Sequence, residues 1–330
     1  HGAWAITAAT VAQARVMHRF GVPRVVLANE VVEPAQVEWL GTVSDEPHFE
    51  VFCLVDSVAG VEQMERALSG SGHEVEVLVE LGVEGRRTGV RDVGEALALA
   101  ERVVQSPSLR LAGVEGYEGV LPQGRDGTSE ATARSWLDRL VDLTVRADAQ
   151  DLFAAAGRVV VTAGGSGYPD LVAEAFSAVP ELSYPSTFVI RSGCYLTHDD
   201  VQYERSSPLR SGADPDPLRP ALTCFSRVLS APEAGRVLLG VGKREISFDV
   251  ELPVVRAVHR GGERIPLDGH ARIVELNDHH GFCDVDADLL GVGDLVELGP
   301  SHPCTVFDKW PLVPVVDADG AVVDAVRTMF

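Results

Sequence analysis

Positive charge and lysine are scarce in this sequence. Its 330 residues include 28 Lys and Arg against 49 Asp and Glu, which gives a formal net charge of −21, and Lys243 and Lys309 are its only lysines. A surface of this sign repels polyanions, so we expect neither nucleic acid nor an anionic membrane as a partner. A small anionic ligand is compatible with this charge, because a binding site can be locally positive.

Cysteine is also sparse, and long apolar runs are missing. The five cysteines are an odd number and include no Cys-x-x-Cys pair, so the sequence favours neither a disulfide framework nor a structural zinc ribbon. No apolar run approaches the ~18 residues that a membrane span needs, and no charged-then-apolar signal segment opens the chain. We therefore expect a protein of the reducing cytoplasm.

The first 195 residues alternate between short apolar runs and helical patterns. Strands are expected at residues 4–7, 24–28, 49–56, 74–80, 111–117, 158–162 and 187–191. Helices are expected at residues 10–20, 58–68, 93–104, 128–147 and 170–178. Strand–helix–strand units that repeat every ~25 residues predict a parallel α/β sheet.

Seven strands are one fewer than the eight that close a (β/α)8 TIM-type barrel. The chain as given begins with His1 rather than Met and runs directly into a predicted strand. We therefore predict a TIM-type barrel whose first strand lies upstream of His1. An open doubly wound sheet is the alternative fold.

A change of pattern follows the barrel. Residues 206–220 (SSPLRSGADPDPLRP) are rich in Pro, Ser and Gly and are typical of a linker. Beyond them, short strands are expected at residues 223–229, 236–239, 246–250, 254–259, 271–276, 295–298 and 312–316. The sequence thus predicts a barrel over residues 1–205, a linker over 206–220 and a C-terminal antiparallel β domain over 221–330.

Two glycine-bearing loops follow the last two predicted barrel strands. Residues 162–167 (TAGGSG) lie between a strand and a helix, where backbone N–H groups and the helix dipole favour a phosphate. Residues 191–195 (RSGCY) follow the next strand. With one upstream strand restored, these loops follow strands 7 and 8, where barrels often bind phosphate. Ordinary tight turns are the alternative. Arg87 follows an earlier strand and could contact an anionic oxygen, or belong to a solvated charge pair.

A histidine and a cysteine two positions apart form the sharpest local motif. His302 and Cys304 can bind one borderline-soft cation, zinc above all. Two protein ligands leave coordination positions open for water or substrate, as a catalytic ion requires. An incidental turn is the alternative. Residues 278–283 (DHHGFC) are a rival cluster, although adjacent side chains on a strand face opposite ways, so its two histidines are not expected on one ion.

These segments together resemble the fold-type III pyridoxal-phosphate enzymes, in particular the D-serine dehydratase and D-threonine aldolase group with its bacterial amino acid deaminases. The resemblance covers essentially the whole chain. The matching segments are residues 2–10 (GAWAITAAT), 27–32 (LANEVV), 87–90 (RTGV), 164–166 (GGS), 191–195 (RSGCY), 240–244 (GVGKR) and 301–310 (SHPCTVFDKW).

The resemblance implies a cofactor, a metal and a dimer. It implies pyridoxal 5′-phosphate and zinc, or another divalent ion such as Mn²⁺, bound by His302 and Cys304. It implies a homodimer in which the β domain of one subunit approaches the barrel of the other. It places the Schiff-base lysine upstream of His1, because both lysines of the chain lie in the β domain. The cofactor-binding residues that it implies are Arg87, Tyr117, Gly165, Ser166, Gly193 and Cys194.

The resemblance also implies a lyase whose small-molecule substrates are β-hydroxy D-amino acids. Dehydratases of this group carry cysteine at the position of Cys304, and many aldolases carry aspartate, so the sequence favours a D-serine dehydratase that forms pyruvate and ammonia. A D-threonine aldolase and a non-catalytic pyridoxal-phosphate-binding protein are the alternatives. D-threo-3-hydroxyaspartate is a further possible substrate. A racemase needs an opposing tyrosine, for which the β domain has no clear candidate.

Overall fold

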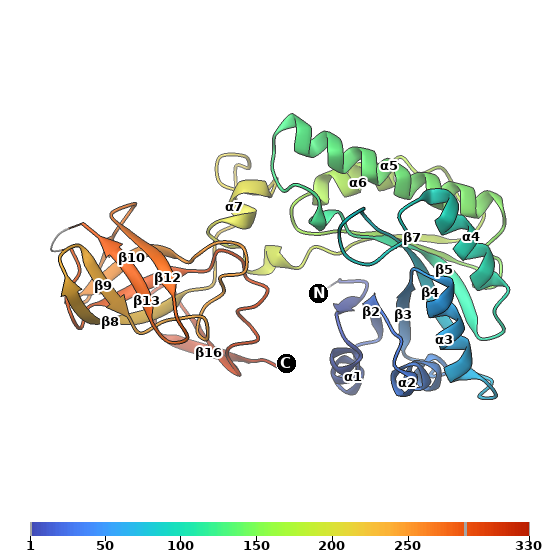
Figure 1. The fold of residues 1–330 in the computed structure, drawn as a ribbon, viewed down its shortest axis with the longest axis horizontal. Coiled ribbons are helices and arrows are strands. Elements are labelled where there is room, and N and C mark those ends of the chain that lie inside the picture. Colours follow the sequence, from blue (N-terminus) through green and yellow to red (C-terminus); the bar gives the residue numbers. More distant parts are fainter. Residues whose placement is uncertain (1, 287–288, 330) are drawn as a thin grey trace. The chain divides into compact units, whose positions relative to one another are not determined.

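The computed structural model describes residues 2–286 and 289–329 and divides into two compact units, residues 1–192 and 193–330. We describe each unit by itself (Figure 1). No helix of the described residues is long and apolar enough to cross a membrane.

The first unit contains a seven-stranded parallel sheet in which neighbouring strands follow the order of the chain, from β1 to β7. The sheet curls, and the helices cover its outer side (Figure 1). The strands are β1 (Ile6–Ala8), β2 (Arg24–Glu30), β3 (Glu50–Val55), β4 (Val75–Leu81), β5 (Leu109–Gly116), β6 (Val159–Ala163) and β7 (Ser186–Ile190). The helices are α1 (Val11–Arg19), α2 (Pro34–Ser44), α3 (Val58–Leu68), α4 (Val93–Val104), α5 (Gly127–Ala149) and α6 (Pro169–Ser177), with a 3₁₀ turn η1 (Glu118–Val120).

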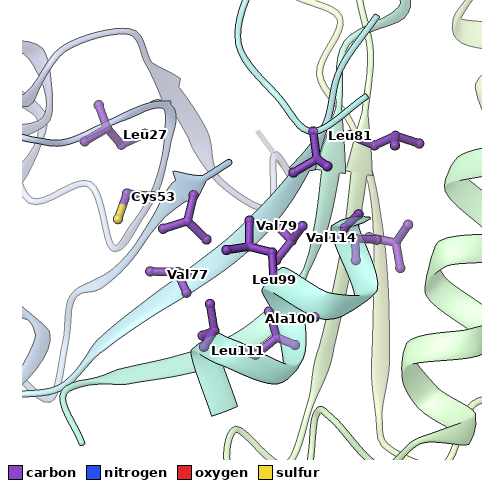
Figure 2. Close-up of a cluster of buried hydrophobic side chains, with 14 of the residues drawn as sticks. Leu27, Cys53, Val77, Val79, Leu81, Leu99, Ala100, Leu111 and Val114 are labelled. Carbon is purple, nitrogen blue, oxygen red and sulfur yellow. The ribbon is translucent and has the colours of Figure 1, made fainter. Parts of the chain in front are cut away.

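Both faces of the middle strands of this sheet carry buried side chains, because successive side chains of a strand point to opposite faces. Val25 and Leu27 of β2 belong to the core between the sheet and its helices, whereas Val26 belongs to a separate cluster on the other face. Figure 2 shows the outer core, in which Leu99 of α4 lies beside Val79 of β4. The predicted barrel-type architecture is confirmed, and in the described residues β1 pairs only with β2, and β7 only with β6.

Helix α2 was not predicted. It begins at Pro34, and Glu33 before it makes no side-chain cap. Four of the five predicted helices have stronger starting signals: Thr10, Ser57, Asp92 and Asp126 each accept backbone N–H groups of the first turn. The fifth, α6, begins at Pro169 without a side-chain cap, as α2 does at Pro34. Proline in the first turn is itself a start signal, but an isolated one is easily missed.

The second unit is built on an antiparallel sheet of seven strands, in the order β11-β10-β14-β8-β9-β13-β12, and a separate hairpin of β15 and β16. The strands are β8 (Cys224–Glu233), β9 (Arg236–Leu239), β10 (Val254–Arg260), β11 (Glu263–Pro266), β12 (Ala271–Leu276), β13 (Gly281–Val285), β14 (Leu295–Gly299), β15 (Leu312–Val316) and β16 (Val322–Arg327). The predicted antiparallel β domain is therefore confirmed, although β11, β13 and β16 were not predicted.

One predicted strand, residues 246–250, is wrong. The apolar alternation of Ile246, Phe248 and Val250 resembles a strand, but the N–H of Ile246 bonds to the carbonyl of Gly242 at 3.2 Å within a turn. Ile246 is buried in the core of the second unit. The side chain of Ile246 therefore belongs to the core without any strand pairing, whereas Phe248 and Val250 are exposed.

The division between the units falls after Ser192, so residues 193–205, which the sequence analysis assigned to the barrel, and the expected linker 206–220 lie in the second unit. This segment contains η2 (Cys194–Leu196) and α7 (Gln202–Ser206). The N–H groups of Asp200 and Gln202 bond to the carbonyls of Pro300 and Ser301 at 3.2 Å each. Asp200 also forms an ion pair with Arg256 of β10. These bonds tie the segment to the β domain.

Two adjacent valines of α4 test the core. Val103 is 0% exposed and Val104 is 43% exposed. We expect Val103→Ala to lower the free energy of unfolding by about 2 kcal/mol, because it leaves a cavity between helix and sheet. The matched change Val104→Ala removes the same atoms from an exposed site, and we expect an effect within about 0.5 kcal/mol. Urea unfolding followed by circular dichroism measures both; equal losses would contradict this packing.

Candidate active site

The predicted metal residues lie in the second unit together with a third side chain. The ligand atoms of Cys194, His302 and Cys304 all lie within 4.8 Å of one another. The two sulfur atoms are 3.6 Å apart. Cys194 begins η2, and the other two residues follow β14. The structure thus brings His302 and Cys304 together as predicted, and adds Cys194, which the sequence analysis had placed in the phosphate loop.

Buried hydroxyl groups hold the loop that carries His302. Ser301 is fully buried and donates its hydroxyl to the carbonyl of Glu251 at 2.5 Å. Ser247 donates to the carbonyl of His302, also at 2.5 Å. The ring of Tyr203, in α7, lies 5.5 Å from the ring of His302, centroid to centroid. The imidazole is therefore fixed from two sides.

The donor atoms of this group suit a borderline-soft cation. Nδ1 of His302 is buried and has no hydrogen-bond partner among the described residues. The hydrogen bond with Cys194 raises the pKa of the Cys304 thiol, and partial removal from water adds to this. A bound cation lowers the pKa of a thiol, because it stabilises the thiolate form directly. Imidazole and thiolate are ligands that zinc prefers.

The rival histidine cluster is not assembled. Nδ1 of His279 lies 2.5 Å from a carboxylate oxygen of Glu245, and Cys283 is buried in the β core. Among the residues that the structure describes, neither His279 nor His280 belongs to a group of three potential metal ligands.

Three of the predicted cofactor residues meet in the first unit, although they come from different strand ends. The guanidinium carbon of Arg87, after β4, lies 4.4 Å from the ring centroid of Tyr117, after β5. A Cβ atom at Gly165, after β6, would lie 3.2 Å from that ring and 3.2 Å from the Cα of Gly119. The carboxyl ends of parallel strands meet at one edge of a sheet, which is where such folds bind ligands.

The glycine loop after β6 packs closely on its neighbours. Gly164 has φ +136°, a conformation that side chains rarely adopt, and a Cβ there would lie 2.8 Å from the backbone nitrogen of Arg191. Ser192 donates its hydroxyl to the carbonyl of Gly165 at 3.1 Å. Ser166 is buried. Gly193, like Cys194, belongs to the second unit.

Two buried glutamates at the same edge were missed by the sequence analysis. Glu118 is 0% exposed and accepts the N–H of Gly165 at 2.6 Å, and burial raises its pKa. Glu115 forms a buried ion pair with Arg191, yet burial outweighs that attraction and raises its pKa to about 7. Their signal in the sequence is a carboxylate within or just after an apolar strand, where a charged side chain is costly.

A second group of carboxylates lies at the ends of β2, β3 and β4. The carboxylate oxygens of Glu30, Asp56 and Glu80 lie within 4.8 Å of one another. Thr88 donates to Glu80 at 3.2 Å, and the N–H of Gly89 bonds to Asp56 at 3.1 Å. Burial, then the hydrogen bond and charge of Glu80 and the charge of Asp56, raise the pKa of Glu30 to about 9. The group therefore retains a proton near neutral pH.

Comparison with known proteins agrees with this geometry. Residues 221–316, which include His302 and Cys304, match the family model of the putative serine dehydratase domain. The chain is 25% identical over 327 residues to the D-threonine aldolase of Arthrobacter sp, a match that covers 98% of this chain and 78% of that protein. It is 23% identical over 301 residues to the 3-hydroxy-D-aspartate aldolase of Paracoccus denitrificans (strain Pd 1222), covering 90% of this chain and 72% of the relative.

The resemblance to this lyase group is confirmed. The fold matches that of the D-threonine aldolase of Filomicrobium marinum, with a TM-score of 0.75, 23% identity and coverage of 99% of this chain and 81% of the other. It also matches the D-threo-3-hydroxyaspartate dehydratase of Delftia sp. HT23, with a TM-score of 0.72, 20% identity and coverage of 99% and 84%. Two further structures are of dehydratase variants in which a histidine and a cysteine two positions apart are each replaced by alanine, and the cysteine variant is described as metal-free.

The cluster of Glu30, Asp56 and Glu80 makes the free energy of unfolding depend on pH. The folded protein holds a proton on Glu30 that the unfolded chain releases above its ordinary pKa of 4.5. The folded state then binds more protons than the unfolded state, so this group makes the free energy of unfolding fall as pH rises from about 4.5 to about 9.

We expect Glu30→Gln to flatten that fall by up to about one proton per molecule. The measurement is the urea midpoint at several pH values between about 5 and 9, where the titration occurs. Glu62→Gln, on the exposed side of α3, is the matched control and should keep the slope of the unmodified protein. An unchanged slope in Glu30→Gln would contradict the shared proton.

Proposed function

We propose that the protein is a pyridoxal-phosphate- and metal-dependent lyase acting on β-hydroxy D-amino acids, with the dehydration of D-serine to pyruvate and ammonia as its reaction. The observation that carries this proposal is the pairing of His302 with the thiol of Cys304 in the second unit. This pair lies in the segment that matches the putative serine dehydratase domain. A thiol at this position is the feature that favours dehydration over aldol cleavage.

The proposed metal binding rests on the chemistry of the potential ligand atoms. His302 offers a buried ring nitrogen with no other partner among the described residues, and Cys304 offers a sulfur in the same group. One solved structure of a dehydratase with a similar fold is of a cysteine-to-alanine variant and is described as the metal-free form. A bound divalent ion supplies a Lewis acid, which makes a β-hydroxyl a better leaving group. The soft donors favour zinc over Mg²⁺ and Mn²⁺.

The proposed cofactor binding rests on residues at the carboxyl edge of the parallel sheet. A Cβ atom at Gly165 would lie 3.2 Å from both Gly119 and Tyr117, a tight contact, and glycine suits a loop whose backbone approaches a phosphate. In this proposal Arg87 contacts the phenolic oxygen, Tyr117 lies against the cofactor, and Gly165 and Ser166 bind the phosphate. The phosphate contacts expected of Gly193 and Cys194 stay predictions. Bound pyridoxal phosphate supplies an electron sink for the substrate α-carbon.

Glu118 must be neutral for this arrangement to bind an anion. Its carboxyl group already accepts the N–H of Gly165, and a charged carboxylate there would repel a phosphate. Burial raises the pKa of Glu118, so a protonated carboxyl is accessible at this position. The residue then acts as a hydrogen-bonding group beside the phosphate rather than as a competing anion.

Residues 1–192 contain no lysine that could hold the cofactor. The assays below use the full-length protein.

D-threonine aldolase is the second candidate, because the relatives named above include aldolases. A divalent ion held by the same residues would then favour loss of the β-hydroxyl proton, and the Cα–Cβ bond would break to give glycine and an aldehyde. A non-catalytic pyridoxal-phosphate-binding protein would bind the cofactor with neither product. The homodimer and the cytoplasmic location stay predictions.

His302→Ala tests the metal role. With D-serine as substrate, we expect pyruvate formation to fall by at least ~100-fold, because the leaving group loses its Lewis acid. His279→Ala, in the rival cluster, is the control and should keep activity within about twofold. Pyruvate and glycine are quantified separately with D-serine and D-threonine. Pyruvate formation that survives both His302→Ala and chelation would refute the metal role, and glycine from D-threonine without pyruvate would favour the aldolase.

Glu118→Gln tests the cofactor site. The amide keeps a hydrogen-bond acceptor for Gly165 but is never charged, so we expect the variant to gain affinity for pyridoxal phosphate over the unmodified protein as pH rises and the Glu118 carboxyl ionises. The difference should shrink toward acidic pH, where the carboxyl is protonated. Fluorescence titration with pyridoxal phosphate over a pH series measures both affinities. Weaker binding in the variant at every pH would show that the charge of Glu118 is not opposed to the phosphate.

A further inference from the structure

Cys194, His302 and Cys304 form the candidate metal group. Neither the sequence motif nor the resemblance assigns Cys194 to the metal. Its sulfur lies 3.6 Å from that of Cys304 and shares a 4.8 Å group with the imidazole of His302. It is 110 residues away from Cys304 along the chain. Its position therefore results from the packing of the second unit and not from the short motif.

The backbone around Cys194 is fixed by several bonds. Its carbonyl accepts the N–H of His198 at 2.7 Å and the N–H of Thr197 at 3.2 Å. Further along the same segment, the N–H of Gln202 bonds to the carbonyl of Ser301, next to His302. The segment that carries Cys194 and the loop that carries His302 are thus held together by main-chain bonds.

The separation of the two sulfurs matches coordination to one ion. Zinc–sulfur bonds of about 2.3 Å at tetrahedral angles place two sulfur ligands about 3.8 Å apart. A disulfide requires about 2.05 Å, so the observed 3.6 Å lies close to shared coordination and far from a covalent bond.

The neighbourhood of the group is also negative. Asp199 is 0% exposed, and one of its carboxylate oxygens accepts the N–H groups of Val201 and Tyr203 at 3.0 and 2.9 Å. The other oxygen has no hydrogen-bond partner among the described residues. The charge of this carboxylate acts on His302. Burial raises the pKa of Asp199, and a cation bound nearby would stabilise its charged form.

We propose that Cys194 is the third protein ligand of the metal, completing a Cys2His set that leaves one position open for the substrate hydroxyl or water. This inference rests on the metal site of the proposed function and goes beyond it. Each thiol releases its proton to water when it binds the ion. Two thiolates make the site strongly thiophilic, so Cys194 determines selectivity for zinc over Mn²⁺ and Mg²⁺.

The test replaces zinc by Co²⁺ in the complete gene product. The near-ultraviolet sulfur-to-cobalt absorption scales with the number of bound thiolates. We expect the intensity of two thiolates in the unmodified protein, about half of it in Cys194→Ser and in Cys304→Ser, and almost none in the double variant. Cys224→Ala, which removes a cysteine outside the group, is the matched control and should keep full intensity.

Zinc affinity gives a second readout. We expect Cys194→Ser to weaken zinc binding at least ~100-fold, more than the loss of a residue that only supports a ligand, and to weaken Mn²⁺ binding much less. Competition titration with a chromophoric chelator measures both constants.

One further measurement uses the unmodified protein, so its result does not depend on whether a variant folds. In the zinc-loaded unmodified protein, both Cys194 and Cys304 should resist alkylation by iodoacetamide, and chelation should expose both to it, as peptide mass spectrometry reports. Protection of Cys304 alone, with one-thiolate absorption unchanged by Cys194→Ser, would overturn this inference while leaving the proposed function intact. Absence of any Co²⁺ or Zn²⁺ binding would refute the metal role as well.

Discussion

The first unit depends on the burial of both faces of its parallel sheet. Alternate residues of one strand pack against the helices and against the inner cluster, as Leu27 and Val26 do. A slip of one residue would exchange the two faces, so the register is strongly specified. Because all seven strands run the same way, their carboxyl ends share one edge. This constraint brings Arg87, Tyr117 and Gly165 together although three different strands precede them.

Buried ionisable groups lie at that edge, and burying them lowers the stability of the fold. Glu115 is paired with Arg191, and Glu118 accepts a backbone N–H, yet burial raises the pKa of both carboxyl groups. A protein that only needed a stable core would place apolar side chains there. Ionisable groups with perturbed pKa values in such positions are typical of functional sites. The electrostatics of the sheet edge therefore support a ligand that contributes its own charges.

The second unit uses a different means to fix its site. Its antiparallel sheet holds the loop after β14 in place, and buried hydroxyls of Ser247 and Ser301 anchor the backbone around His302. The segment 193–206 packs onto the same loop through main-chain bonds. The result is a group of three soft donor atoms supported by rigid structure, which is what a selective metal site requires.

The sequence by itself determined the alternation of strands and helices, the seven parallel strands, the antiparallel β domain and the pairing of His302 with Cys304. These features are local, because periodicity, caps and a two-residue spacing are visible in short windows. Sequence reasoning missed α2, and it wrongly assigned a strand to residues 246–250, where Ile246 is buried in a turn while Phe248 and Val250 are exposed. Only the tertiary structure placed Cys194 beside Cys304 and Glu118 beside Gly165. Those contacts join residues 110 and 47 positions apart, and they follow from how the chain packs, which no short pattern records.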